Sequence, residues 1–175
     1  MKEKIKGIIM IDLKPSLGVI ENGKHYFPVR VYYNHTDAGG IMYYANYFRI
    51  AEEARVAMFD VLASDDLKGY NDIKSVGDFV VRTAHAEYYK SAHFGEDLVI
   101  EDSIEEIGKV FVVVNQKIMR GDELLVEIKT KIVFVGVECG DHKAGCPLGS
   151  GGVVVGKPQR IPEFWVKKLE KLTNK

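Results

Sequence analysis

The chain of 175 residues has few cysteines and no long apolar run. Its two cysteines, Cys139 and Cys146, stand close together in one Gly-rich segment, so a disulfide framework like that of small secreted domains is excluded. Near the N-terminus the apolar run Ile8–Ile11 is interrupted by Asp12, whereas a secretory signal needs a longer apolar core. No run approaches the roughly 20 residues that a membrane-spanning helix needs. We therefore expect a cytoplasmic protein without a membrane span.

The sequence also lacks an excess of charge of either sign. It has 24 Lys and Arg residues against 25 Asp and Glu residues, which gives a formal net charge of −1. A basic surface is the usual footprint of nucleic-acid or anionic-membrane binding, so both are excluded as bulk partners. A local basic pocket for a phosphorylated cofactor is compatible with this balance. With 46% hydrophobic and 28% charged residues, the chain is expected to fold as one domain around a packed core.

One long helix and a series of strands account for most of the pattern. Apolar residues between Ile41 and Ala63 recur at steps of three and four, which predicts an amphipathic helix. Runs rich in β-branched and aromatic residues predict antiparallel strands at residues 25–33, 78–89, 96–107, 110–120 and 123–137. A short helix is expected to begin within residues 160–165. One long helix against an antiparallel sheet is an α+β architecture, and we expect the other face or an edge of the sheet to be covered by self-association.

Changes in composition suggest the domain boundaries. They divide the chain into an N-terminal extension, a domain and a C-terminal tail, at residues 1–24, 25–166 and 167–175. Residues 138–156 are a Gly-rich insertion in the domain. Its Cys139, His142 and Cys146 are a weak zinc motif, because their spacing is not that of a standard zinc site and structural zinc needs four ligands. We therefore predict no metal site.

A single acid, Asp37, stands in the turn between the first strand and the long helix. Backbone amides at a helix N-terminus have no intrahelical partner, and that end of the helix dipole is positive. An acid beside such amides suits attack on a carbonyl and polarisation of its oxygen. Asp is also favoured as a helix cap or turn residue, which is the alternative interpretation. Gly39 and Gly40 favour the chemical interpretation, because they permit a tight turn that another molecule can approach closely.

Four stretches of the chain resemble a known enzyme family. Residues 30–47 read Arg-Val-x-Tyr-x-x-Thr-Asp-x-x-Gly-apolar-x-Tyr-x-x-Asn-Tyr, and shorter matches follow at residues 80–94, 119–127 and 160–162. The long pattern resembles the active-site signature of the 4-hydroxybenzoyl-CoA thioesterase family of hotdog-fold proteins. Its Thr-Asp-Ala-Gly-Gly turn is most similar to the branch of bacterial acyl-CoA thioesterases associated with the Tol–Pal gene cluster. The resemblance implies a hotdog fold, a long central helix wrapped by a curved antiparallel sheet, that assembles as a homodimer or homotetramer.

The resemblance also implies an activity and roles for single residues. The implied reaction is hydrolysis of an acyl-CoA thioester to a free acid and coenzyme A, at a dimer interface and without a metal or redox cofactor. Asp37 matches the family's catalytic Asp, a nucleophile or general base, and the Tyr44 backbone amide matches the donor to the thioester oxygen. Gly40 matches the catalytic turn, and Gly39 beside it the substrate-binding part of that turn. The other substrate-binding candidates are Asn46 and, for the phosphates of coenzyme A, Lys90 and Arg82.

One departure from the nearest branch bears on the mechanism. Many of its members have His where this chain has Tyr44, and Glu-Asp where it has Asn34 and His35. A phenol titrates near about pH 10, so Tyr44 cannot replace an acid–base His at neutral pH, and His35 is the neighbouring candidate. Two alternatives stay open. One is a hotdog hydratase or dehydratase that uses His35 with Asp37, and the other is a binding module that holds acyl-CoA or an acyl carrier protein without hydrolysis.

Overall fold

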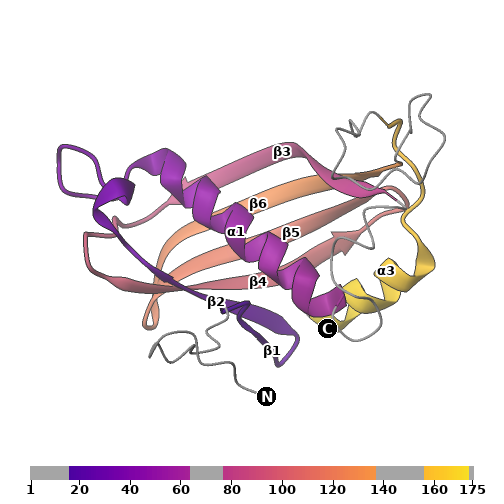
Figure 1. Cartoon of the computed structure of the whole chain (residues 1–175), viewed down its shortest axis with the longest axis horizontal. Helices are drawn as coiled ribbons and strands as arrows, with labels where there is room; N and C mark the ends of the chain where they lie inside the picture. The colour runs from indigo at the N-terminus through magenta and orange to yellow at the C-terminus, as the bar shows by residue number, and fades with distance from the viewer. Residues whose placement is uncertain (1–15, 64–76, 137–155, 174–175) are drawn as a thin grey trace, which may run out of the picture.

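The structure, a computed structural model, describes residues 16–63, 77–136 and 156–173. A 6-stranded sheet curves around one long helix, α1 (Tyr44–Ala63), which lies across one of its faces (Figure 1). The strands are ordered β1-β2-β4-β5-β6-β3, and each neighbouring pair is antiparallel. This architecture is the α+β hotdog fold, as predicted.

The sheet agrees closely with the strands predicted from sequence. Its strands are β1 (Val19–Glu21), β2 (Lys24–Arg30), β3 (Asp78–Tyr88), β4 (Asp97–Ile107), β5 (Phe111–Arg120) and β6 (Glu123–Val135). Gly121, at φ +57°, makes the tight turn between β5 and β6. The short strand β1 lies within the predicted N-terminal extension and pairs with β2. The strand β3 forms one edge of the sheet, and most of its residues are exposed.

Two predicted boundaries differ from the structure, and both lie beside Asp37. The strand predicted at residues 25–33 ends at Arg30, because the chain then turns into a short 3-10 helix, η1 (Tyr33–His35). The helix predicted from Ile41 begins at Tyr44. The intervening residues are held in extended bridges, Ile41 with His93 and Met42 with Thr36. Backbone pairing with a distant segment therefore overrides the helical pattern at the start of α1.

The core forms two apolar clusters under α1. The cluster nearer Asp37 includes Ile50, Ala54 and Leu98, whereas the cluster at the C-terminal end of α1 includes Met58 and Trp165. The helical residues come from one stripe at three- and four-residue steps, which explains why this face is buried. Each fully buried large apolar side chain contributes about 1.5–3 kcal/mol through removal from water. This packing fixes α1, and with it the segment around Asp37, against the sheet.

The C-terminal residues belong to the second cluster. The helix α3 (Glu163–Leu169) is followed by η2 (Glu170–Leu172), and Trp165, Leu169 and Leu172 are fully buried. The predicted boundary at residue 166 therefore falls inside α3. Apart from Gly156, the predicted insertion at residues 138–156 lies outside the described residues. Among the helices of the described ranges, none has both the length and the apolarity needed to cross a membrane.

A buried polar network crosses the core between β2, β4, β5 and α1. His25 Nδ1 lies 2.6 Å from Asp102 Oδ2, and Gln116 Nε2 donates to Asp102 Oδ1 at 2.7 Å and to the Ala51 carbonyl at 2.7 Å. Arg55 donates to Gln116 Oε1 at 3.1 Å. Burial raises the pKa of Asp102, although the hydrogen bonds from His25 and Gln116 oppose this shift. The network links the central part of α1 to three strands.

Candidate active site

Asp37 lies in a small hairpin between η1 and α1. Its amide donates to the Ile41 carbonyl at 2.9 Å, and the Gly40 amide donates to the Asp37 carbonyl at 3.0 Å. Gly40 has φ +75°, in the left-handed region where a side chain is strained. The sequence Asp-Ala-Gly-Gly therefore fits this turn, which holds the acid at the surface.

The Asp37 carboxylate is exposed and anchored by its own turn. The Gly39 amide donates to Asp37 Oδ1 at 2.8 Å, the side-chain-to-backbone bond of an Asx turn. A Cβ on residue 39 would lie 3.1 Å from that oxygen, so glycine suits this close approach. No other donor to the carboxylate is found in the described part of the chain. One oxygen is thus fixed, while the other remains available to a substrate or a water molecule.

The start of α1 lies immediately beside this turn. Tyr44 is the first residue of the helix, and within the described residues neither its amide nor that of Ala45 has a hydrogen-bond acceptor. Asn46 Nδ2 donates to the His35 carbonyl at 2.8 Å, and the Tyr43 amide donates to the same oxygen at 2.9 Å. Asn46 therefore fastens the helix start to η1, and it does not line the pocket described next.

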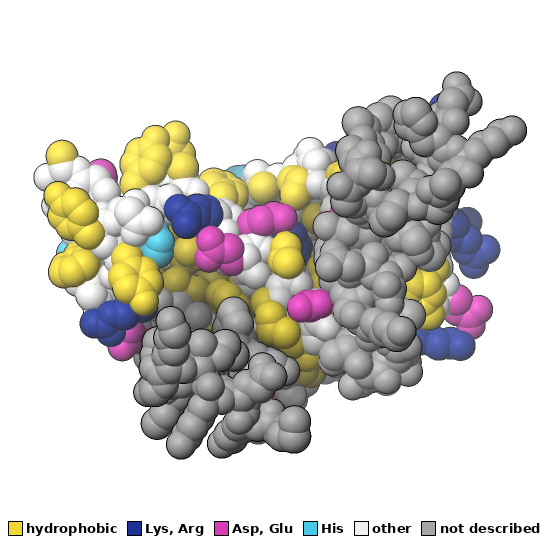
Figure 2. Space-filling view, viewed as in Figure 1, with side chains coloured by type: hydrophobic (Ala, Val, Ile, Leu, Met, Phe, Trp, Pro, Cys, Tyr) yellow, Lys and Arg dark blue, Asp and Glu magenta, His cyan; other side chains and the backbone are white. Residues whose placement is uncertain are grey.

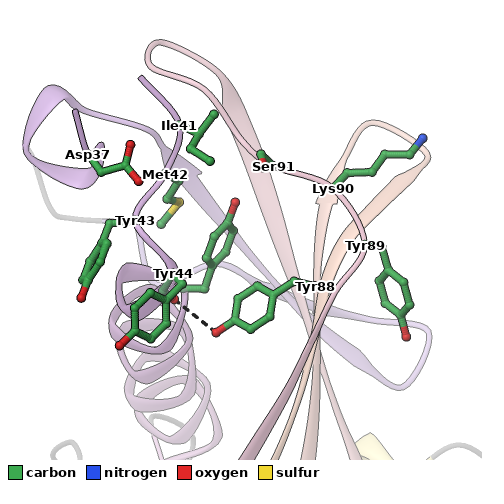
Figure 3. Close-up of a pocket in the computed structure, with 10 residues that line it drawn as sticks. Asp37, Ile41, Met42, Tyr43, Tyr44, Tyr88, Tyr89, Lys90 and Ser91 are labelled. Atoms are coloured by element: carbon green, nitrogen blue, oxygen red, sulfur yellow. Dashed lines mark hydrogen bonds between the residues drawn. The ribbon is translucent and has the colours of Figure 1, made fainter. Parts of the chain in front are cut away.

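A pocket of about 350 Å³, here called the Asp37 pocket, lies between this helix start and the end of β3. Figure 3 shows Asp37 and the first residues of α1 on one side, facing the segment Tyr88–Ser91 on the other. The Tyr88 hydroxyl donates across the pocket to the Tyr44 carbonyl at 3.3 Å. Its lining residues are Asp37, Ile41, Met42, Tyr43, Tyr44, Tyr47, Tyr88, Tyr89, Lys90 and Ser91.

Tyrosines dominate the pocket and act there as donors and apolar surfaces. Burial raises the pKa of both Tyr47 and Tyr88. Hydrogen bonding with Tyr44 raises the pKa of Tyr43. These phenols therefore stay protonated near neutral pH and offer no general base. Hydrophobic side chains gather at this end of the molecule in Figure 2, and the exposed ones include Tyr33 and Phe94.

Two of these tyrosines, Tyr43 and Tyr47, fall in the apolar stripe of the predicted helix, which favours a place in the core. Tyr88 belongs to residues 80–94, one of the stretches that resemble the family. Tyr43 precedes α1 and is exposed, whereas Tyr47 lies in α1 and is buried, and its hydroxyl accepts from the Ala92 amide at 2.9 Å. One available signal was position: Tyr88 ends a predicted strand, and Tyr44 begins the helix beside Asp37.

The cations near the Asp37 pocket are already paired with acids. Lys90 forms an ion pair with Glu123, and in Figure 3 its side chain extends away from Asp37. Arg120 bonds Glu96 at 2.9 Å and also Glu123. Burial raises the pKa of Glu96, but bonds from the His93 amide and Arg120 outweigh that effect and leave it below the usual value. Lys90 thus lines the pocket with its charge paired to Glu123, and its predicted binding of coenzyme A phosphates stays a prediction.

Arg82, the other cation predicted to bind phosphate, lies elsewhere. It stands in an irregularity of β3 and lines a second cavity, of about 460 Å³, with Thr83, Phe111 and Lys131. We call this the Arg82 cavity; its other lining residues are Val110, Val133 and Pro158. Within this single chain, Arg82 and Asp37 are therefore not brought into one site.

His35 is held away from the Asp37 pocket. It is only 7% exposed, and its Nδ1 accepts a hydrogen bond from the Tyr32 amide at 3.2 Å. Burial lowers the pKa of His35, and the nearby Arg49 lowers it further. The His35 imidazole is buried, its Nδ1 is occupied, and it does not line the Asp37 pocket. No group of three potential metal ligands is found in the described ranges, and Cys139, His142 and Cys146 lie outside them.

Comparison with known proteins supports the interpretation of this geometry. The model of the thioesterase superfamily matches residues 39–127, about half of the chain. The acyl-CoA thioesterase YbgC of Haemophilus influenzae is 31% identical over 67% of this chain and 84% of its own length. The acyl-CoA thioester hydrolase YbgC of Escherichia coli is 34% identical over 62% of this chain and 80% of its own length.

Solved structures show the same fold. A 1,4-dihydroxy-2-naphthoyl-CoA thioesterase from Synechocystis superposes with a TM-score of 0.66 at 19% identity, covering 86% of this chain and 98% of that one. At this identity the likeness bears on the fold alone. The family match covers the start of α1 and begins two residues after Asp37, so it identifies the family. The chain therefore belongs to the thioesterase superfamily and is a thioester hydrolase.

Proposed function

We propose that the protein hydrolyses acyl-CoA thioesters to a free acid and coenzyme A in the Asp37 pocket. One observation carries the proposal: an exposed carboxylate, anchored by the Gly39 amide, lies beside the first turn of α1, where the Tyr44 amide has no acceptor among the described residues. A thioester carbonyl bound there has an acid beside its carbon and a backbone donor for its oxygen. The curated relatives named as acyl-CoA thioesterases support this choice of substrate.

The developing negative charge on the thioester oxygen is the main demand on the site. The Tyr44 amide, at the positive end of α1, donates to that oxygen, and the charge grows as the carbon becomes tetrahedral. Gly40 maintains the turn that sets Asp37 against this donor. The role belongs to the backbone of Tyr44, so a Tyr in place of the branch's His leaves it intact.

Two routes lead from this arrangement to products. Asp37 attacks the acyl carbon, expels the thiolate of coenzyme A and forms an anhydride that water hydrolyses. Alternatively, Asp37 takes a proton from water as the water attacks. Both routes use a carboxylate, water and backbone amides, so the proposed reaction needs no metal or redox cofactor. In both, the acyl group lies in the Asp37 pocket.

A second copy of the chain completes the proposed enzyme. The outer edge of β3 has no partner strand among the described residues, and a bare edge is a template for pairing. Val81, on the side of β3 that faces α1, is 51% exposed, which leaves apolar surface for a partner to cover. We propose a homodimer formed through β3, or a pair of such dimers, with the Asp37 pocket near the shared edge.

The hydratase alternative finds less support in the geometry. It needs His35 and Asp37 to act together on one substrate, but the His35 ring bonds the Tyr32 amide and does not line the pocket. The acid is therefore without an imidazole partner at the site. A thioesterase that relies on one carboxylate and backbone amides fits this arrangement better.

Free-thiol release from short, long and aromatic acyl-CoA esters, and from an acyl carrier protein ester, tests the proposal. Asp37→Asn keeps the acceptor for the Gly39 amide, so the turn should remain folded while thiol release is lost. Asp122→Asn, in the exposed β5–β6 turn, is the matched control and should keep wild-type rates. Absence of thiol release by the wild type on every donor would refute the hydrolase, and undiminished release by Asp37→Asn would refute the role of Asp37.

A further inference from the structure

The described cations fall into two sets according to their partners. Those near Asp37 each have a carboxylate at ion-pair distance: Arg30 with Asp97, Arg49 with Glu53, Lys90 with Glu123, and Arg120 with Glu96. A second set has no carboxylate at that distance among the described residues, and part of it gathers at the other end of the sheet: Arg82, Lys109, Lys131, Lys157 and Arg160.

Two of these unpaired cations line the Arg82 cavity from neighbouring strands. The register of β3 against β6 shifts between Val81 and Thr83, so Arg82 and Thr83 both stand opposite Lys131. Such a bulge re-aims side chains, and it sets a guanidinium, a hydroxyl and an ammonium around one space. Lys131 Nζ also lies 4.0 Å from the centre of the Phe111 ring, which holds the ammonium at the cavity wall.

The cavity lies on the face of the sheet that α1 does not cover. Along β6, Ile132 is buried in the core beneath the helix, so Lys131 and Val133 point to the opposite face. Pairing of β3 with a second copy would use its backbone edge and leave this face open. Arg82 and Tyr88 are six positions apart on the same strand, which separates the cavity from the Asp37 pocket by about 20 Å.

Further cations surround the cavity without lining it. Val110 and Pro158 belong to its wall, and the exposed Lys109 and Lys157 are their immediate chain neighbours. The Lys109 carbonyl accepts from the Ile161 amide at 2.9 Å, which ties the segment that contains Arg160 to the same rim. An anion in the cavity would therefore contact Arg82 and Lys131 directly, with Lys109, Lys157 and Arg160 close by.

We propose that the Arg82 cavity binds a phosphate-bearing small molecule. Arg offers a planar pair of donors that matches phosphate oxygens, and Lys adds a point charge. At about 460 Å³ the cavity is in the size range of small-molecule sites, and Phe111 supplies an apolar wall beside the charged one. The site rests on its own charges and does not depend on hydrolysis at Asp37.

Isothermal titration calorimetry of the full chain with pyrophosphate and with adenosine 3′,5′-bisphosphate tests this site. The double variant Arg82→Gln with Lys131→Gln should lower the affinity about 100-fold, because each of the two lost charged hydrogen bonds accounts for about tenfold. Lys129→Gln is the matched control: Lys129 lies two residues from Lys131 on the same face but pairs with Glu105 at 2.8 Å. Lys129→Gln should change the affinity less than about twofold, because the Lys129 charge is already paired with Glu105. Equal affinities of the double variant and the wild type, or no binding of either probe, would overturn the proposal.

Two thioesters then distinguish the source of the phosphate. If it belongs to the substrate, the double variant raises KM for acyl-CoA and leaves KM for the phosphate-free acyl-pantetheine unchanged. If the phosphate belongs to a separate ligand, the double variant leaves both KM values unchanged but still binds the phosphate probes more weakly. Both of these results support the phosphate site. If the wild type hydrolyses neither thioester, the proposed function fails, and calorimetry still decides the phosphate site.

Discussion

The two ends of the sheet differ in whether their cations are paired with acids. Around the Asp37 pocket, Lys90 and Arg120 are paired with acids and the free surface is tyrosine. Around the Arg82 cavity, Arg82 and Lys131 have no acid at ion-pair distance among the described residues. The first end suits a neutral acyl thioester and a charge that develops during reaction. The second suits a ligand that carries its negative charge from the start.

The comparison predicts its largest effect at Asp37. Asp37→Asn should lower kcat for thiol release by at least about 100-fold, because an amide neither attacks carbon nor accepts a proton from water. Steady-state kinetics with the best acyl-CoA of the panel give this ratio. Binding of adenosine 3′,5′-bisphosphate should be unchanged in the same variant. A joint loss of both properties would contradict the separation of the two ends.

The next largest effect is expected from a substitution that strains the turn beside Asp37, compared with the same substitution in the turn between β5 and β6. Gly40→Ala and Gly121→Ala both force a side chain into the left-handed region, at φ +75° and φ +57°, and neither new Cβ meets a heavy atom within 4 Å. Each should cost about 1–2 kcal/mol of stability, measured by urea unfolding. Only Gly40→Ala should lose most of the thiol-release activity, since its turn sets Asp37. Equal activity losses would show that stability alone controls the rate.

A smaller effect is expected across the Asp37 pocket. Tyr88→Phe removes the hydroxyl bond to the Tyr44 carbonyl but keeps the ring, whose centroid lies 5.8 Å from that of Tyr47. The lost bond is worth about 0.5–1.5 kcal/mol, so kcat/KM should fall several-fold through looser positioning of the helix start. Tyr89→Phe is the control, because no hydrogen bond of its hydroxyl is found in the described chain. A rate unchanged by Tyr88→Phe would assign Tyr88 to the wall alone.

The smallest effect is the dependence of stability on pH. Protonation of Glu96 and Glu123 at low pH would leave the cations near the Asp37 pocket unpaired, like those around the Arg82 cavity. Bonds from the His93 amide and Arg120 lower the pKa of Glu96 despite burial, and bonds from Lys90 and Arg120 lower the pKa of Glu123. A lowered carboxylate pKa stabilises the fold above the unfolded value, near 4.5, and this stability is lost as pH falls through the folded value. Melting temperatures of the wild type should therefore drop below about pH 4.5, and those of Glu96→Gln should drop less.

The elements of the fold could be predicted from local pattern, and the errors occur where distant segments meet. The three- and four-residue apolar steps predicted α1, and the runs of β-branched and aromatic residues at 110–120 and 123–137 predicted β5 and β6. The start of α1 was placed too early, because Ile41 pairs with His93, far along the chain. No pattern of nearby residues predicts a backbone bridge between segments so far apart in the chain. The buried pair of His25 and Asp102 was missed for the same reason.

The candidate site was predicted in part. The position of Asp37 beside a helix start follows from the order of strand, turn and helix, and the structure places Tyr44 at the first position of α1. Lys90 and Arg82 were both predicted to bind the phosphates of coenzyme A, and that role stays a prediction. Their surroundings differ, because the pairing of a charge depends on its neighbours in space. Glu123 neutralises Lys90, while the bulge in β3 sets Arg82 beside Lys131.

The sequence by itself determined the α+β class, the periodic helix, the succession of antiparallel strands and the acid in a Gly-containing turn. These depend on interactions between residues close in the chain, such as backbone bonds across short turns and the burial of one helical stripe. Only the tertiary structure decided which cations are neutralised, which tyrosines face a pocket and which edge of the sheet is bare. These depend on side chains brought together from distant strands, and their electrostatic energies are set by separation and burial rather than by sequence spacing.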